Sequence, residues 1–449
     1  MTTTPSTPES DNSKAQDTAS VPAGRIARLA RLGSLATGVA GGMLAEGARQ
    51  LAQGNRPSMG ELLMTPANAK RVADELARLR GAAMKVGQLL SMDAGDLLPA
   101  ELAEIFGRLR ADAQPMPLLQ LSKVLEENWG KDWKTKFRQF SLQPLAAASI
   151  GQVHEAHTQD ARHLALKIQY PGVRASIDSD VDNVATLLRL AGLIPKGLDY
   201  QPLLDEAKRQ LHQEADYLRE AGYMRQYQSL LADSPHYTLP TVCEELTTPN
   251  ILAMSFMGGV PIEAISYASQ TERDQVMTWL LALLFREIFE FRLIQTDPNF
   301  ANYRYDQRNQ QLILLDFGAT RAYPAAIAEA YRQLMQGAVE YDRAKMDTAA
   351  ADIGFFQAAI HPKQREAVID LFTQACEPLR WQGVYDFGAS SLAGRIRDAG
   401  LVLSMEQGYW HTPPADALFL HRKLGGLYLL AAKLRAKVDV RSLFLPYLH

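Results

Sequence analysis

The most constraining feature of this 449-residue chain is a short apolar run, Leu312 to Leu315, that leads directly into Asp316-Phe317-Gly318. The run predicts a buried strand with the Asp316 carboxylate at its end, where an aspartate can hold Mg²⁺ against phosphate groups. The same three residues also occur in ordinary turns after strands. Upstream, however, Asp297 and Asn302 have the D-x-x-x-x-N spacing of a loop in which the aspartate orients a proton and the asparagine binds a second Mg²⁺. Asp297 precedes Asp316 by 19 residues, which leaves room for a short hairpin.

A second region has the pattern of a phosphate-binding loop followed by a strand. The pattern G-x-G-x-x-G-x-V is matched with alanine at the first two glycine positions, by Ala146, Ala147, Ala148, Ser149, Ile150, Gly151, Gln152 and Val153. Alanine keeps such a loop small but restricts its backbone relative to glycine. Lys167 follows Val153 by 14 residues, at the end of a run that predicts a strand offering a lysine to the α/β-phosphates.

Each of these four motifs is weak alone, but their order and spacing argue against coincidence. They predict an α+β, two-lobed protein-kinase-like fold that binds ATP or ADP with Mg²⁺ between the lobes. The adenine is expected near Met254 to Gly258, with Met254 and Met257 among its contacts.

Carboxylates that could pair with Lys167 lie on a predicted helix, Gln201–Leu231. Asp216 and Glu220 are four residues apart and would share one face of that helix, whereas Glu214 and Glu220 would point about 120° apart. One helix could therefore serve two cations. Carboxylates of this kind are usually solvated surface groups, but the kinase-like motifs around them favour the pairing.

A second cation is Lys85, in the segment Lys85-Val86-Gly87-Gln88 of a predicted apolar helix. By itself this segment is also typical of a surface lysine followed by a helix-weakening glycine.

Together these residues resemble the UbiB/AarF family of atypical kinase-like ATPases, in particular its coenzyme Q kinase-like subgroup. The segments that carry the resemblance are Lys85–Gln88, Ala146–His154, Gln213–Tyr217, Gln295–Asn299 and Asp316–Gly318, and it extends from about Pro22 to the C-terminus, including His421-Arg422-Lys423. It implies ATP binding and hydrolysis, membrane association and support of ubiquinone biosynthesis. It also implies that an extension packs over the cleft, locked by Lys85, Gln88, Glu214 and Asp216, which leaves Glu220 as the partner of Lys167.

In this arrangement Asp297 is expected to act as the base or to orient water, Lys167 to clamp phosphate, and Asn302 and Asp316 to bind the metal. The expected activity is that of an Mg²⁺-dependent ATPase or small-molecule kinase. The alternatives are a nucleotide-binding pseudokinase scaffold and a protein kinase. Gln295-Thr296 replaces His-Arg before Asp297 and no A-P-E follows Gly318, so the sequence does not favour the protein kinase.

The region before the predicted kinase-like lobes changes character twice. Residues 1–21 are rich in Thr, Ser, Pro and Asp, which predicts disorder. In residues 22–64, Arg25, Arg28 and Arg31 precede an uncharged run of 14 residues, 32–45, whereas a spanning helix needs about 20. This predicts a membrane-surface segment or, equally, a Gly/Ala-rich helix packed on its own protein. The remaining units expected are a helical extension at 65–135, an N-lobe at 136–258 and a helical C-lobe at 259–449.

Charge and cysteine content restrict the partners and the compartment. A formal net charge of −3 provides no basic footprint for nucleic acid. Only Cys243 and Cys376 occur, far apart, which indicates a reducing compartment. The expected location is the cytoplasmic face of a bacterial inner membrane, or the matrix side in mitochondria. Ubiquinone-pathway enzymes, quinone precursors and a second copy of the chain are the candidate partners besides the lipid surface.

Overall fold

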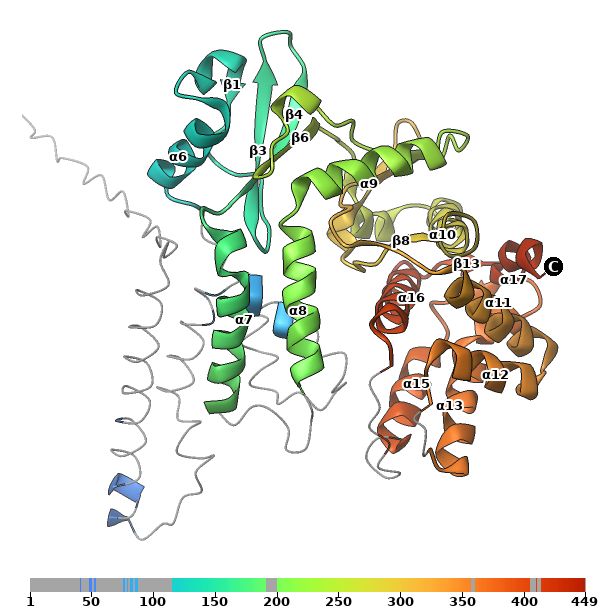
Figure 1. Ribbon diagram of the computed structural model, residues 1–449. Helices are drawn as coiled ribbons and strands as arrows, with labels where there is room; N and C mark the ends of the chain where they lie inside the picture. The colour runs from blue at the N-terminus through green and yellow to red at the C-terminus, as the bar shows by residue number, and fades with distance from the viewer. Residues whose placement is uncertain are drawn as a thin grey trace, which may run out of the picture.

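The computed structural model describes residues 115–190, 200–356, 360–403, 409 and 413–448, with 41, 48–50, 52–53, 76, 79, 81–83 and 85–87. These residues form a small lobe built on a β-sheet and a larger, mostly helical lobe (Figure 1). Among them, no helix is both long and apolar enough to cross a bilayer. The predictions for residues 1–21, for nearly all of 22–64 and for Gln88 lie outside the described residues.

The small lobe is a five-stranded antiparallel sheet with the order β1-β3-β4-β6, in which β2 also pairs with β3. The strands are β1 (Phe137–Phe140), β2 (Ala146–Ala147), β3 (Gly151–Thr158), β4 (His163–Gln169) and β6 (Ile251–Ser255). In β4, Leu164, Leu166 and Ile168 alternate with Lys167, so that the apolar side chains lie on one face and Lys167 on the other.

Helix α6 (Leu118–Trp129) covers the apolar face of this sheet (Figure 1). Its Leu121, Leu125 and Trp129 share one hydrophobic cluster with Leu166 of the sheet. The boundary predicted between the extension and the N-lobe, at residue 135, is therefore wrong, because α6 belongs to the core of the N-lobe.

Three helices lie between β4 and β6 in the chain: α7 (Val173–Leu190), α8 (Gln201–Glu214) and α9 (Tyr217–Leu230). The prediction of a single helix over Gln201–Leu231 is wrong, because the helix is interrupted at Ala215-Asp216. The Asp216 carboxylate accepts a hydrogen bond from the backbone N–H of Arg219 at 3.1 Å, so this aspartate starts a new helix as its N-cap.

The described residues 81–83 and 85–87 are helical and lie between α7 and α8, as the blue segments of Figure 1 show. Ala83 and Val86 belong to the same hydrophobic cluster as Val184 of α7 and Leu211 of α8. This part of the predicted extension is thus packed on the lobe that carries the site.

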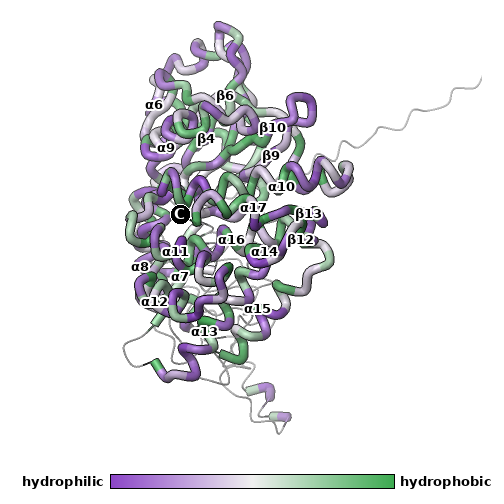
Figure 2. Tube along the Cα trace, turned by 90° about the vertical axis from the view of Figure 1, so that its right-hand side faces the viewer, coloured by the Kyte–Doolittle hydropathy of each residue, from purple (hydrophilic) through white to green (hydrophobic). Residues whose placement is uncertain are grey.

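The connection between the lobes holds a four-stranded sheet of order β5-β10-β9-β7. Its strands are β5 (Tyr237–Thr238), β7 (Val260–Pro261), β9 (Tyr303–Asp306) and β10 (Gln311–Leu314), and hydrophobic residues predominate in β10 (Figure 2). The hairpin expected between Asp297 and Asp316 is the β9–β10 pair. Leu239–Leu246 form no continuous strand, because Pro240 has no N–H to donate to a sheet and Glu244–Leu246 form a 3-10 turn, η3.

Helix α10 (Gln270–Phe285) is the buried centre of the large lobe and continues into a π-helical turn, Arg286–Phe291. Seven of its last ten residues are buried, which is typical of a helix enclosed by its own protein. The short strands β8 (Leu293–Gln295) and β11 (Thr320–Ala322) pair antiparallel beside it.

The remaining elements complete the large lobe. They are α11 (Ala325–Glu340), α12 (Arg343–Ile353), α13 (Pro362–Ala375), α14 (Glu377–Arg380), β12 (Tyr385–Asp386), α15 (Leu392–Leu401), α16 (Ala415–Lys433), β13 (Lys437–Val438) and α17 (Val440–Phe444). Short 3-10 turns lie at Trp133–Lys136, Ile262–Tyr267, Phe300–Asn302 and Leu445–Tyr447.

Candidate active site

The structure brings Lys167, Glu220 and Asp316 together, although they come from β4, α9 and the turn that follows β10. The Lys167 Nζ lies 2.7 Å from Glu220 Oε1 and 3.1 Å from Asp316 Oδ2. The Glu220 side chain is 1% exposed, whereas that of Asp316 is 34% exposed. Lys167 therefore has a buried partner that holds it in place and a second partner that opens to the cleft.

Burial and charge act differently on these three groups. Burial raises the pKa of Glu220 to about 7, even though Lys167 opposes this. Burial would also raise the pKa of Asp316, but the Lys167 ammonium and the Gly318 N–H lower it below its usual value. Burial would lower the pKa of Lys167, yet Asp316 and Glu220 raise it well above the ordinary range. The site thus retains a charged lysine and a charged Asp316, and Glu220 titrates near neutrality.

The Asp316-Phe317-Gly318 turn is held by α9. The Asp316 Oδ1 accepts the Gly318 N–H at 2.9 Å, and the Phe317 N–H points to Glu220 at 3.4 Å. Phe317 is buried, and its ring centroid lies 4.9 Å from that of Tyr227. These contacts fix the direction of the Asp316 carboxylate toward Lys167.

Asp297 and Asn302 lie on the loop between β8 and β9. The Asn302 Nδ2 donates to Asp297 Oδ2 at 2.9 Å, so the two predicted catalytic-loop side chains are in direct contact. The Thr296 hydroxyl donates to the Ala319 carbonyl at 2.7 Å, and Gln295 pairs with Thr320 across β8 and β11. This pairing holds the loop beside the segment that follows Asp316.

The alanine-rich loop is a tight turn between β2 and β3, closed by a 2.8 Å hydrogen bond from the Ala148 N–H to the Gly151 carbonyl. All residues from 146 to 153 are described, and none has a positive φ. Alanine is thus tolerated at 146 and 148, because the turn uses no left-handed conformation. At Gly151 a Cβ would lie 2.3 Å from the Ile168 carbonyl oxygen, so only glycine fits there.

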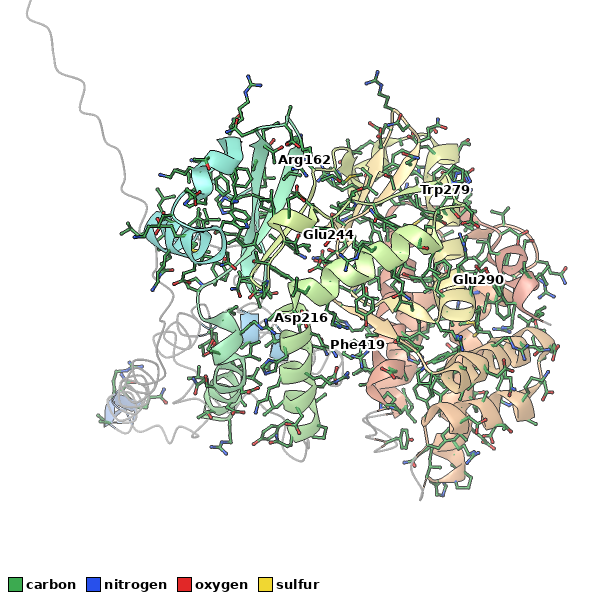
Figure 3. The ribbon with its side chains drawn as sticks, turned by 45° about the horizontal axis from the view of Figure 1, so that its top comes forward. Arg162, Asp216, Glu244, Trp279, Glu290 and Phe419 are labelled. Carbon is green, nitrogen blue, oxygen red and sulfur yellow. The ribbon has the colours of Figure 1, made fainter. Side chains whose placement is uncertain are left out.

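The extension contacts this loop and the end of α8. Lys85 forms an ion pair with Glu214, and the Ser149 hydroxyl donates to the other Glu214 oxygen at 3.1 Å. A Cβ on Gly81 would lie 2.7 Å from the Ser149 carbonyl oxygen, which shows how closely the two segments approach. Asp216, which the resemblance placed in the same lock, instead caps α9, as Figure 3 shows at the α8–α9 junction.

A narrow, open recess lies beside this contact. Lys85, Glu214, Asp297 and Arg422 are among its lining residues, together with Phe419, which Figure 3 labels on α16. The predicted lock and the predicted catalytic loop therefore face one common space.

The expected adenine contacts lie at the other end of the sheet. Met254 is buried in β6 and pairs with Ala165 of β4, while Met257 is half-buried two residues beyond the strand end. Val153 pairs with Lys167 across β3 and β4, so its side chain lies on the same face of the sheet as the lysine.

A buried charge network that the sequence motifs did not predict lies behind the loop of Asp297 and Asn302. Lys423 of α16 donates to the Gln295 carbonyl at 2.8 Å and pairs with Glu287 at 3.2 Å, and both charged side chains are at most 2% exposed. Tyr227 of α9 donates to Glu287 at 2.8 Å. The available signal was a lysine inside an apolar helix and a glutamate inside the apolar run before Gln295.

Helix α16 also touches the loop through a glycine. A Cβ on Gly426 would lie 2.4 Å from the Pro298 Cβ, so the helix can approach the catalytic loop only without a side chain there. Lys423 and Gly426 are three residues apart on α16, and both contact the segment Gln295–Pro298, which packs against this helix.

Comparison with known proteins agrees with this geometry. Residues 108–350, more than half of the chain, match the ABC1 atypical kinase-like domain. The mitochondrial atypical kinase COQ8B of Rattus norvegicus is 40% identical over 431 residues, which cover 96% of this chain and 81% of the relative. The mitochondrial atypical kinase COQ8 of Saccharomyces cerevisiae is 38% identical over 428 residues, covering 95% and 85%.

A solved structure supports the same fold. Rv3197 of Mycobacterium tuberculosis, in its complex with erythromycin, superimposes with a TM-score of 0.57 at 24% identity over 84% of this chain and 94% of that chain. The predicted kinase-like fold and the predicted resemblance are therefore confirmed. A kinase-like fold implies nucleotide binding between its lobes. The chain belongs to the ABC1 (UbiB/AarF) family of atypical kinases, within the group of the COQ8 proteins.

Proposed function

We propose that this protein is an Mg²⁺-dependent, atypical kinase-like ATPase that supports coenzyme Q biosynthesis at a membrane surface. The observation that carries the proposal is the convergence of Lys167 and Asp316 at 3.1 Å, in a chain that also retains Asp297 and Asn302 in contact. A scaffold that had lost catalysis would not need all four groups. The near full-length similarity to COQ8 atypical kinases supports the pathway assignment.

The residues present fit a magnesium–nucleotide complex. Asp316 and Asn302 offer oxygen ligands, which Mg²⁺ prefers, and the half-exposed Asp316 carboxylate is charged. When bound, Mg²⁺ would neutralise charge on the phosphates. Lys167 would contact the α/β-phosphates from the sheet, and Asp297 would orient the attacking hydroxyl or water, held by the Asn302 amide.

Water or a small molecule is the better acceptor than a protein. Glu214 ties the extension, through Lys85, to the end of α8, and ties the alanine-rich loop to the same place through Ser149. The extension therefore occupies space at the front of the cleft where a protein segment would have to lie. Thr296, which precedes Asp297 where protein kinases have an arginine, is occupied by its bond to Ala319.

Phosphate release from ATP by the purified full chain tests this proposal. Asp316→Asn should reduce turnover by at least about 100-fold, because a metal ligand and the charge opposite Lys167 are both lost. Lys437→Met, which breaks an exposed pair with Asp386, is the control and should leave turnover unchanged. Unchanged hydrolysis in a folded Asp316→Asn variant would refute the site, and nucleotide binding without any turnover in the wild type would favour the pseudokinase scaffold.

The membrane surface, ubiquinone-pathway enzymes and quinone precursors are the partners proposed, at the inner face of a bacterial membrane or the matrix side in mitochondria. The arginines before the short uncharged run motivate the lipid contact. A second copy of the chain remains a proposed partner, and nucleic acid is not proposed, given the net charge of −3.

A further inference from the structure

A cluster of metal-binding side chains lies on the β3–β4 hairpin, away from the proposed phosphate site. Glu155 and His157 are two residues apart on β3, so their side chains share one face of the sheet. His163 of β4 is the register partner of His157. One carboxylate oxygen and one ring nitrogen from each histidine lie within 4.8 Å of one another.

Two imidazoles and one carboxylate are a donor set that Zn²⁺ and similar divalent ions bind, often with an open fourth position. All three side chains are half-buried, so solvent can reach such a position. Mg²⁺ is a poor candidate because it prefers six oxygen ligands. The donor types therefore separate this cluster from the proposed Mg²⁺ ligands Asp316 and Asn302.

The present contacts need only a small change to accept an ion. His163 Nε2 lies 2.6 Å from Glu155 Oε1, which is a shared-proton distance. Ligand atoms around a tetrahedral metal are about 3.4 Å apart, so the pair must open by roughly 0.8 Å as the metal replaces the proton. The His157 and His163 rings are stacked at 4.3 Å with a 12° interplanar angle, so their nitrogens must tilt toward each other. Rotations of half-buried side chains on a fixed hairpin can supply both movements.

The cluster is coupled to the connection between the lobes. The His163 ring stacks on Phe256 at 4.1 Å, and the Phe256 N–H donates to the His163 carbonyl at 2.9 Å. Phe256 directly follows β6 and precedes Met257, where the adenine is expected. Lys167 lies four residues along β4, about 13 Å away at the usual strand rise, on the same face.

We infer that Glu155, His157 and His163 form a binding site for a divalent transition metal of the Zn²⁺ type. A stack of aromatic rings that merely covers the sheet would explain why the rings of His157, His163 and Phe256 lie parallel. It would not explain why a Glu155 oxygen lies within 4.8 Å of a ring nitrogen of both histidines. The bound ion would join β3 to β4 and, through the ring of Phe256, restrain the segment that connects the lobes.

The test uses the full chain without any histidine tag, in the presence of excess Mg²⁺. Co²⁺ is added as the probe, because its visible absorption reports nitrogen and oxygen ligands, and Zn²⁺ is then added to displace it. The wild type should bind one equivalent of Co²⁺ that Zn²⁺ displaces, and Zn²⁺ should raise its melting temperature. His157→Ala should lose both effects.

Glu155→Gln should weaken Zn²⁺ binding by at least about tenfold, since even outer-shell partners of metal ligands cost that much. His212→Ala is the matched control: His212 is on α8, half exposed and paired with Asp178, and its loss should change nothing. His157→Ala is preferred to His163→Ala because it leaves the stack on Phe256 in place, and its own melting temperature in the absence of metal verifies folding. Failure of the wild type to bind, or equal binding by His157→Ala, would overturn the inference.

Discussion

Lys423 and Glu287 show how much a single buried charge can decide at the residue scale. Both are almost fully buried, and the Lys423 ammonium lies 3.2 Å from Glu287 and 2.8 Å from the Gln295 carbonyl, two residues before Asp297. Burial would lower the pKa of Lys423, but Glu287 raises it, so the lysine stays charged. The pair therefore supports, from the side of α16, the loop that carries the predicted catalytic residues.

We expect Lys423→Met to destabilise the protein by about 3–5 kcal/mol, because it leaves Glu287 buried without its cation. Urea unfolding measures this change. If the variant folds, its kcat for ATP hydrolysis should fall while nucleotide affinity stays near the wild-type value. Lys433→Met, on the same helix and in an exposed pair with Glu263, should cost at most about 1 kcal/mol. Equal effects of the two substitutions would contradict the role given to Lys423.

Glu220 makes stability depend on pH. Its pKa is raised by burial to about 7, above the ordinary value of 4.5 expected in the unfolded chain. The folded state therefore holds this proton more tightly, so the contribution to stability is present below about pH 4.5 and is lost as the pH rises through about 7.

Melting temperatures measured without nucleotide from pH 5 to pH 8 check this expectation. Replacing Glu220 by Gln should remove the part of the decline that falls near pH 7, because glutamine carries no titrating proton. Glu244→Gln, at an exposed pair with Arg225, should leave the pH dependence as in the wild type. If the Glu220→Gln and wild-type profiles run parallel over this range, Glu220 does not titrate there.

At the scale of elements, the contact between the extension and the alanine-rich loop depends on a glycine. The Gly81 Cα approaches Ser149 so closely that a Cβ would lie 2.7 Å from the Ser149 carbonyl oxygen. Because that oxygen belongs to the backbone, it cannot rotate away, and the helix itself must move.

We expect Gly81→Ala to displace the extension helix and weaken the Lys85–Glu214 pair. Limited proteolysis should then cut near residues 81–87 at least about tenfold faster, since a contact worth about 1.4 kcal/mol changes an opening equilibrium by that factor. Gly222→Ala is the matched control in α9, where the nearest atom to a new Cβ is 3.9 Å away. That variant should be stabilised by about 0.5–1 kcal/mol. An unchanged cutting rate in Gly81→Ala would mean that the extension is not held at this point.

For the whole molecule, membrane attachment remains a prediction from sequence. Arg25, Arg28 and Arg31 precede an uncharged run of 14 residues, too short to span a bilayer at about 20 residues. We expect the full chain to sediment with anionic liposomes and less so as salt rises, because cations near the surface contribute about 1 kcal/mol each.

Replacing the three arginines by glutamine should reduce this sedimentation by at least about tenfold at low salt, and deleting residues 1–54 should reduce it further. Neutral liposomes are the control, and they should capture little of either protein. Equal sedimentation of the full chain and the truncated chain would show that another surface makes the contact.

Local sequence patterns predict the parts of the site that lie within single short segments. The predictable segments were the strand just before Asp316, the hairpin after Asp297 and the strand of Lys167. The motifs on these segments also predicted the family. Hydrophobic alternation and turn residues act over such distances, so one sequence suffices to place them.

Which distant groups meet depends on contacts that form only in the folded chain. Two features depend on contacts across more than a hundred residues: the packing of α6 in the N-lobe core and the support of the predicted catalytic loop by Lys423. A third, the interruption between α8 and α9, depends on the Asp216 carboxylate competing for one backbone N–H. The register that pairs His157 with His163 is of the same kind. A charge survives burial only where a partner from elsewhere in the chain offsets its desolvation, and folding alone supplies that partner.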